Sequence, residues 1–334
     1  MSRLSIFSSD ATDFRPGDPV WRAALRAVAV AVVVLAAGEA TARMLLRDVG
    51  RRWEYWQPVA ATKFEFVRTA AEQGQTLRTL VVGDSTGMSD LDPRVLEREL
   101  GPRSWNAAWN GNFPLAFEET TLPLLADRRL RVDWIVASFI PAGFAGSDRP
   151  TSSEAGLLAS TYVQKRTTTQ TGDYVYLARF KSAWPFLLND LLGHKEAPSV
   201  TRFGYAPNQN HATAEMITSE PSQPPVVALN QRRLQVLKSL VTIAAGRHSR
   251  LLIVMPPSLT TSPGRLSIAR LLRAELAAET QGSPVRFLDL TQAQFLELGD
   301  FGDVNHLNAR GAAELTTEVA RAIKRWSSEP VSSD

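Results

Sequence analysis

The sequence LRTLVVGDSTGMSDLDP (77–93) joins an apolar strand to a small polar turn, at the start of an α/β pattern. Its β-branched run predicts a buried strand at 78–83. The strand ends in Gly83, and Asp84 and Ser85 come next in the sequence. The hydroxyl of Ser85 is therefore expected where the strand reaches the surface. Gly-Asp-Ser is also an ordinary turn sequence. Whether the hydroxyl of Ser85 is reactive therefore depends on what the rest of the chain brings to it.

Strands and helices alternate after this stretch. We expect further strands at 104–109, 132–140, 250–257 and 285–290, and helices at 90–101, 114–127, 228–248, 264–282 and 308–326. Asp90 and Asp92 are typical capping residues for the first of these helices, and Pro123 is expected to interrupt the second. Such alternation predicts an α/β fold in which helices cover both faces of a parallel sheet.

A long apolar segment, 20–46, precedes the α/β pattern. Its uncharged run from Ala27 to Gly38 is shorter than the roughly 20 residues of a membrane span, but the full segment is long enough. We predict a single transmembrane helix at 20–46, with the larger C-terminal part outside the cytoplasm. A signal peptide cleaved near ATA (40–42) and a buried helix of a soluble protein are the alternatives.

The remaining segments differ in composition. We predict a disordered tail, the membrane anchor, a helical connector, the α/β domain and a second tail, at 1–19, 20–46, 47–76, 77–326 and 327–334. Regular periodicity is lost between residues 141 and 225. A segment of this length without a clear pattern is typical of an insertion that borders a site.

Composition excludes several functional classes. The 37 basic and 34 acidic residues are scattered and leave a formal charge of only +3, so there is no basic patch for nucleic acid. The absence of cysteine excludes thiol catalysis, disulfides and cysteine-based zinc sites. Four histidines do not suggest a histidine-rich metal site. We expect neither a metal nor a cofactor, and no nucleic-acid partner.

The segment FGDVNHLNARG (301–311) contains a possible base for Ser85. Asp303 and His306 lie three residues apart, between the last expected strand and the last helix. Functional groups of such folds gather beyond the carboxyl ends of the strands, so this loop and Ser85 are expected at the same edge. A serine hydroxyl needs a base to take its proton, and a carboxylate can orient an imidazole.

Two motifs together resemble the SGNH/GDSL hydrolase superfamily: GDS after the first strand, and DVNHLN (303–308) before the last helix. The resemblance covers residues 77–326. It implies a flavodoxin-like, three-layer α/β/α fold and an activity of ester hydrolysis or acyl transfer. By motif, it implies that Ser85 is the nucleophile, His306 the general base and Asp303 the partner that orients the base.

The resemblance also implies an oxyanion hole made by Ser85, Gly111 and Asn112. Gly111 lies in NAAWNGN (106–112), where Asn106 is a further candidate support, although Gly111 equally suits a plain turn. The third family block, Gly-x-Asn-Asp, is replaced by ASFIPAGF (137–144). Loss of one oxyanion donor costs about a hundred- to a thousandfold in rate. Another residue replaces that Asn, or the activity is slow or absent.

These features predict a membrane-anchored serine esterase or acyltransferase. The chain is similar to membrane-anchored SGNH-like proteins of polysaccharide O-acetylation, which implies an acetyl ester on a cell-surface polysaccharide as substrate. A membrane-bound acyltransferase is an implied partner. The missing third-block Asn favours an alternative, a catalytically degenerate scaffold in envelope polysaccharide assembly. A lipase or thioesterase acting on membrane lipids is a third alternative.

Overall fold

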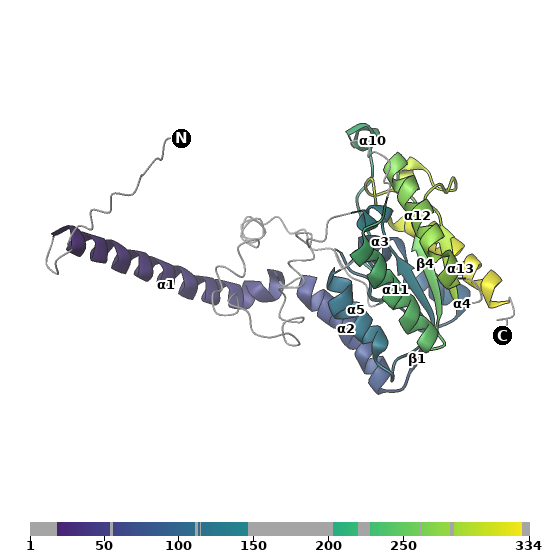
Figure 1. Ribbon diagram of the computed structural model, residues 1–334, viewed down its shortest axis with the longest axis horizontal. Helices are drawn as coiled ribbons and strands as arrows, with labels where there is room; N and C mark the ends of the chain where they lie inside the picture. The colour runs from purple at the N-terminus through teal and green to yellow at the C-terminus, as the bar shows by residue number, and fades with distance from the viewer. Residues whose placement is uncertain are drawn as a thin grey trace, which may run out of the picture. The chain divides into compact units, whose positions relative to one another are not determined.

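A computed structural model describes residues 19–53, 56–110, 113, 115–145, 203–219, 228–260, 262–280 and 284–328 (Figure 1). The chain forms two compact units, one of residues 1–53 with 169–193 and one of residues 54–168 with 194–334. Most of the predicted N-terminal tail, the end of the C-terminal tail and the centre of the predicted insertion lie outside the described residues.

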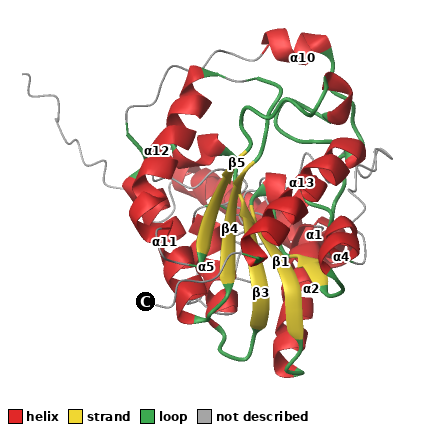
Figure 2. Ribbon diagram, turned by 90° about the vertical axis from the view of Figure 1, so that its right-hand side faces the viewer, coloured by secondary structure: helices red, strands yellow, loops and turns green. Residues whose placement is uncertain are grey.

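A five-stranded parallel sheet forms the centre of the second unit (Figure 2). Its strands are β1 (Thr76–Gly83), β2 (Ser104–Asn106), β3 (Arg131–Ser138), β4 (Arg250–Met255) and β5 (Val285–Asp289). The order β2-β1-β3-β4-β5 is that of flavodoxin-like folds, in which ligands bind beyond the carboxyl ends of the strands at the β1/β3 switch point. The predicted α/β fold with a parallel sheet is confirmed.

Helices cover both faces of this sheet. In the described part of this unit the helices are α2 (Trp56–Glu72), α3 (Ser85–Asp90), α4 (Pro93–Leu100), α5 (Leu115–Ala126), α10 (Ala214–Ser219), α11 (Gln231–Gly246), α12 (Pro263–Thr280) and α13 (Ala309–Ser327), with short 3-10 turns η1 (Pro141–Phe144) and η3 (Leu298–Asp300). Helix α10 lies away from the sheet (Figure 2). Helix α13 packs against α3 and α4, and α11 packs against α5 on the other side of the sheet (Figure 2).

Three local features differ from the sequence prediction. Strand β2 ends at Asn106, whose side chain accepts a hydrogen bond from the N–H of Ala108, although the N–H groups of Ala107 and Trp109 still donate to Val81 and Gly83 of β1. Helix α5 continues through Pro123, which is exposed, so the carbonyl that lacks a donor can face water. Asp92 caps α4 as expected, whereas Asp90 ends α3 and its side chain is buried.

The hydrophobic core extends into the segment that precedes β1. Phe64, Val67, Ala70 and Ala71 of α2 are buried in the same cluster as the strand residues. Since α2 also packs against β1 and α5, part of the segment 47–76 belongs to the core and does more than connect.

Helix α1 (Pro19–Trp53) belongs to the other unit and is considered by itself. Its segment Trp21–Thr41 is long and apolar enough to cross a membrane, and apolar side chains such as Val33 and Leu35 are exposed. The predicted N-terminal apolar helix is therefore present. Signal sequences have the same length and composition, so the choice between anchor and signal peptide, and the orientation, stay predictions.

Candidate active site

The structure brings Ser85, His306 and Asp303 into one chain of close polar contacts. Ser85 begins α3 directly after β1, and the other two side chains come from the loop between η3 and α13. Nε2 of His306 lies 2.8 Å from Oγ of Ser85, although 221 positions separate the two residues. Nδ1 of His306 lies 2.9 and 3.0 Å from the two carboxylate oxygens of Asp303. This is the geometry of a serine–histidine–aspartate triad.

The backbone around Ser85 is held by Gly83 and Asp84. Gly83 has a φ of 130°, and a Cβ at this position would lie 1.9 Å from the carbonyl oxygen of Ser138. Asp84 caps α3 by accepting from the N–H of Thr86, and its second oxygen accepts from the N–H of Ile140, 2.8 Å away. The first two residues of the motif therefore join the ends of β1 and β3 and place Ser85 at the switch point.

Asp303 is oriented by donors from two segments. Its Oδ1 accepts hydrogen bonds from the backbone N–H groups of Asn305 and His306, at 2.8 and 2.9 Å. Nδ2 of Asn208 donates to Oδ2, at 3.1 Å. Sequence reasoning did not identify Asn208, because it lies in the irregular region 141–225 and forms no motif with His306. Its role in orienting Asp303 is indicated only by this hydrogen bond, which joins residues 95 positions apart in the sequence.

The carboxyl group of Asp303 is ionised. Burial raises its pKa, but hydrogen bonds from His306 and the backbone, together with the charge of His306, lower the pKa by more, so that the net shift is downward. A carboxylate can only accept a hydrogen bond, so Nδ1 of His306 carries a proton. In the neutral imidazole, Nε2 then presents its lone pair to the hydroxyl of Ser85.

His306 lies among three acidic side chains. Burial lowers its pKa, but the hydrogen bond to Asp303 and the charges of Asp90, Asp303 and Asp84 raise it by more, to about 9. The imidazole is therefore mostly protonated at neutral pH. It becomes available as a base as the pH rises towards 9.

The predicted oxyanion hole is only partly described. Gly111 and Asn112 lie outside the described residues. Asn106 is fully buried, and its amide donates to the carbonyl oxygens of Gly87 and Leu91, so it cannot support an oxyanion. At the end of β3, the N–H of Ile140 is already engaged by Asp84. Within the described residues, neither Asn106 nor Ile140 replaces the missing third-block Asn.

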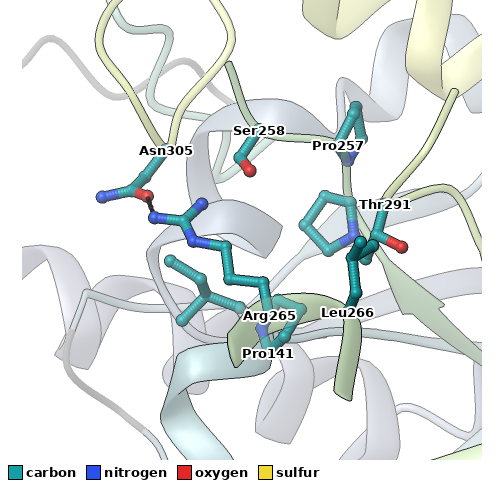
Figure 3. A pocket seen from close by; sticks show the side chains of 9 residues that line it. Pro141, Pro257, Ser258, Arg265, Leu266, Thr291 and Asn305 are labelled. Atoms are coloured by element: carbon teal, nitrogen blue, oxygen red, sulfur yellow. Dashed lines mark hydrogen bonds between the residues drawn. The ribbon is translucent and has the colours of Figure 1, made fainter. Parts of the chain in front are cut away.

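A small cavity lies beside this site, beyond the carboxyl ends of β3, β4 and β5 (Figure 3). Its volume of about 10 Å³ holds about one water molecule. Asn305 lines it and accepts a hydrogen bond from Arg265, whose side chain extends along the cavity wall (Figure 3). A wider groove of about 490 Å³ adjoins it, because both are lined by Leu266 and Thr291. Arg270, Arg273, Asp289 and Gln292 line that groove together with the apolar Leu266, Ala269 and Ala293, and Arg273 donates to Asp289.

No protein-family model matches the sequence, and no curated protein matches it significantly. Among solved structures, the chain is similar to an acetylxylan esterase from Geobacillus stearothermophilus, determined as a catalytic mutant. The match has 13% sequence identity and a TM-score of 0.36, and it covers 76% of this chain and 95% of that chain. This likeness is too distant to indicate an activity.

Proposed function

We propose that this protein is a membrane-anchored serine esterase or acyltransferase of the SGNH type. The observation that carries the proposal is the contact of Nε2 of His306 with Oγ of Ser85, with Asp303 on the opposite side of the imidazole. A hydroxyl, a base and an orienting carboxylate in this order are the arrangement that nucleophilic acyl transfer needs.

In the proposed reaction, Oγ of Ser85 attacks the carbonyl carbon of an ester while Nε2 of His306 takes the hydroxyl proton. Asp303 stabilises the imidazolium that forms. His306 then gives the proton to the departing alcohol, and the acyl group stays on Ser85. Water or a carbohydrate hydroxyl attacks this acyl-enzyme, with His306 again acting as base, and Ser85 is regenerated.

We assign stabilisation of the oxyanion to the backbone N–H groups of Ser85 and Gly111, with the side chain of Asn112 as a third donor. This assignment follows the family resemblance. It accounts for the lack of Asn in the segment 137–144, because Asn112 would supply the missing donor instead.

The proposed substrate is an acetyl ester on a cell-surface polysaccharide. This choice follows the family resemblance. The groove that adjoins the small cavity is compatible with it, because Arg270 and Gln292 offer donors that can bind sugar hydroxyl groups. A membrane-bound acyltransferase is the proposed partner that would supply the acetyl group.

The decisive variant is Ser85→Ala. We expect it to abolish acetate release from p-nitrophenyl acetate by the full-length protein, with an unchanged circular dichroism spectrum. Ser239→Ala, which removes a hydroxyl from α11 that bonds only to the helix backbone, serves as the matched control and keeps full activity. Unchanged turnover in Ser85→Ala would reject the proposal.

The alternative function, a non-catalytic scaffold of envelope polysaccharide assembly, is favoured by the missing third-block Asn. A serine-directed fluorophosphonate distinguishes the two functions. Covalent labelling of the wild type that is lost in Ser85→Ala supports the enzyme, whereas a scaffold with no activated serine would not react.

A further inference from the structure

A second carboxylate, that of Asp90, reaches the loop that carries His306. Asp90 is the last residue of α3, the helix that Ser85 begins, and its side chain is completely buried. Its Oδ1 accepts a hydrogen bond from the backbone N–H of Leu307, at a distance of 3.0 Å. One side chain therefore joins the helix of the nucleophile to the residue that follows the base, across 217 positions of sequence.

The two ends of α3 are also linked to each other. The hydroxyl of Ser89 lies 2.8 Å from the carbonyl oxygen of Ser85 and 2.8 Å from Oδ1 of Asp90. Thr316 of α13 lies 3.4 Å from the backbone oxygen of Asp90, and α13 packs against α3. A shift of Asp90 would therefore displace both Ser85 and the His306 loop.

The charge of Asp90 needs an explanation beyond this hydrogen bond. Its second oxygen, Oδ2, is buried and accepts no hydrogen bond from the described residues. Burial raises the pKa of Asp90 to about 7, while the charge of His306 and the bonds from Ser89 and Leu307 lower it. An uncharged acceptor could hold the Leu307 N–H equally well, without the cost of burying a carboxylate.

The imidazole of His306 supplies the explanation. Three acidic side chains act on its charge. Asp84 and Asp90 lie at the start and the end of α3, and Asp303 lies in the same loop as His306. The charges of His306 and Asp303 in turn act on Asp90, and the charge of Asp90 also acts on Tyr205. His306 is thus the cation that a charge on Asp90 can stabilise.

We propose that Asp90 is a positioning residue of this site, which holds the His306 loop through Leu307 and stabilises the positive charge that His306 gains when it takes the proton of Ser85. The inference rests on the proposed function, in which His306 is the base. It adds a fourth side chain to the relay, one that contacts the backbone of the loop and acts on the imidazole through its charge.

The test is Asp90→Asn in the full-length protein, because this variant keeps an oxygen for the Leu307 N–H and removes the charge, with an amide NH2 group in place of the second oxygen. The protein is labelled with isotopes at its four histidines, and His306→Gln identifies the signal of His306. We expect the titration midpoint of His306 to fall by about one pH unit, since a neighbouring negative charge is lost. The acid limb of kcat/KM for p-nitrophenyl acetate should move to lower pH in parallel, with kcat reduced about tenfold and KM unchanged.

Asp92→Asn is the matched control. Asp92 is also buried, lies two residues away and caps α4, but its charge is paired with Arg94 and is not among the main charges that act on His306, so its loss should leave the midpoint in place. A midpoint that does not move in a folded Asp90→Asn protein would overturn the proposal. If the amide prevents folding, Asp90→Ser is a second neutral variant; it removes the Leu307 hydrogen bond together with the charge, and the midpoint should fall there as well.

The magnetic-resonance titration does not require turnover. A wild-type protein that lacks esterase activity but shows the shift would reject the proposed function and keep the link between Asp90 and His306. Activity without the shift would keep the proposed function and remove Asp90 from the site.

Discussion

Gly83, Asp84 and Ser85 each have a different task at the end of β1. Gly83 lets the backbone pass against Ser138, Asp84 binds the N–H of Ile140 and caps α3, and Ser85 presents its hydroxyl to His306. Asp84 is buried, and burial raises its pKa although its hydrogen bonds and the charge of His306 oppose the shift. The motif therefore combines the proposed nucleophile with two residues that position it.

The pKa of His306 predicts an alkaline activity profile. Burial lowers this pKa, but Asp303 and the neighbouring charges raise it to about 9. Since only the neutral imidazole can take the proton of Ser85, kcat/KM for an acetyl ester should rise with pH until about pH 9 and then level off. Asp303→Asn should shift this rise of kcat/KM to lower pH and reduce kcat about a thousandfold, because the imidazolium loses its main partner. A flat profile between pH 6 and 9 would contradict the assignment of His306 as base.

Lys63 of α2 is a buried titratable group whose protonation gives a testable pH dependence. Its Nζ donates to the carbonyl oxygen of Ala108, 2.6 Å away, and burial lowers its pKa from 10.5 to about 7. Between pH 7 and 10.5 the unfolded chain binds this proton and the folded chain does not, so the stability of the wild type should rise with pH. Relative to Lys63→Met, we expect the wild type to gain about 1–3 kcal/mol in free energy of unfolding between pH 7 and pH 10.

Chemical denaturation at several pH values measures this difference. The comparison with Lys63→Met cancels the titration of all other groups. An equal pH dependence in both proteins would mean that Lys63 keeps its proton in the folded state.

At the level of elements, the close approach of β1 and β3 depends on the absence of a side chain at Gly83. Gly83→Ala should lower the free energy of unfolding by about 2–4 kcal/mol, because the new Cβ would overlap the carbonyl oxygen of Ser138 at a positive φ. Gly246→Ala is the opposite case, since a Cβ at the end of α11 meets nothing within 4 Å. It should stabilise the protein by about 0.5–1 kcal/mol. Thermal unfolding of the two variants measures both effects, and equal effects would contradict this account.

Helix α3 shows how a short element can support a site. It has only six residues, yet it carries Ser85 at one end and Asp90 at the other. Asp84 caps it, and α13 packs against it. Its position therefore depends on the sheet and on the last helix, both of which also hold the loop of His306.

At the scale of the whole molecule, α2 contributes to the core, whereas the side chains described for α1, at residues 21–41, are not part of that cluster. Phe64 and Val67 of α2 are almost fully buried, and Lys63 holds the loop after β2. A chain that begins at residue 54 should be found in the soluble fraction instead of the membrane fraction. Its unfolding temperature should equal that of the full-length protein. A chain that begins at residue 77 should be unstable, because Phe64 and Val67 contribute about 1.5–3 kcal/mol each. Fractionation and thermal unfolding of both truncated chains test this, and equal stability would place α2 outside the core.

The amino-acid sequence by itself determined the class of fold and the two segments that form the site. Apolar runs and capping residues are local signals, so the β-strands, the helices, Ser85 and the Asp303–His306 pair could be placed from neighbouring residues alone. The strand order, the contact between Ser85 and His306, and the roles of Asn208, Asp90 and Lys63 came only from the tertiary structure. Each of these depends on burial or pairing with a residue far away in the chain, and such contacts leave no periodic pattern in the sequence.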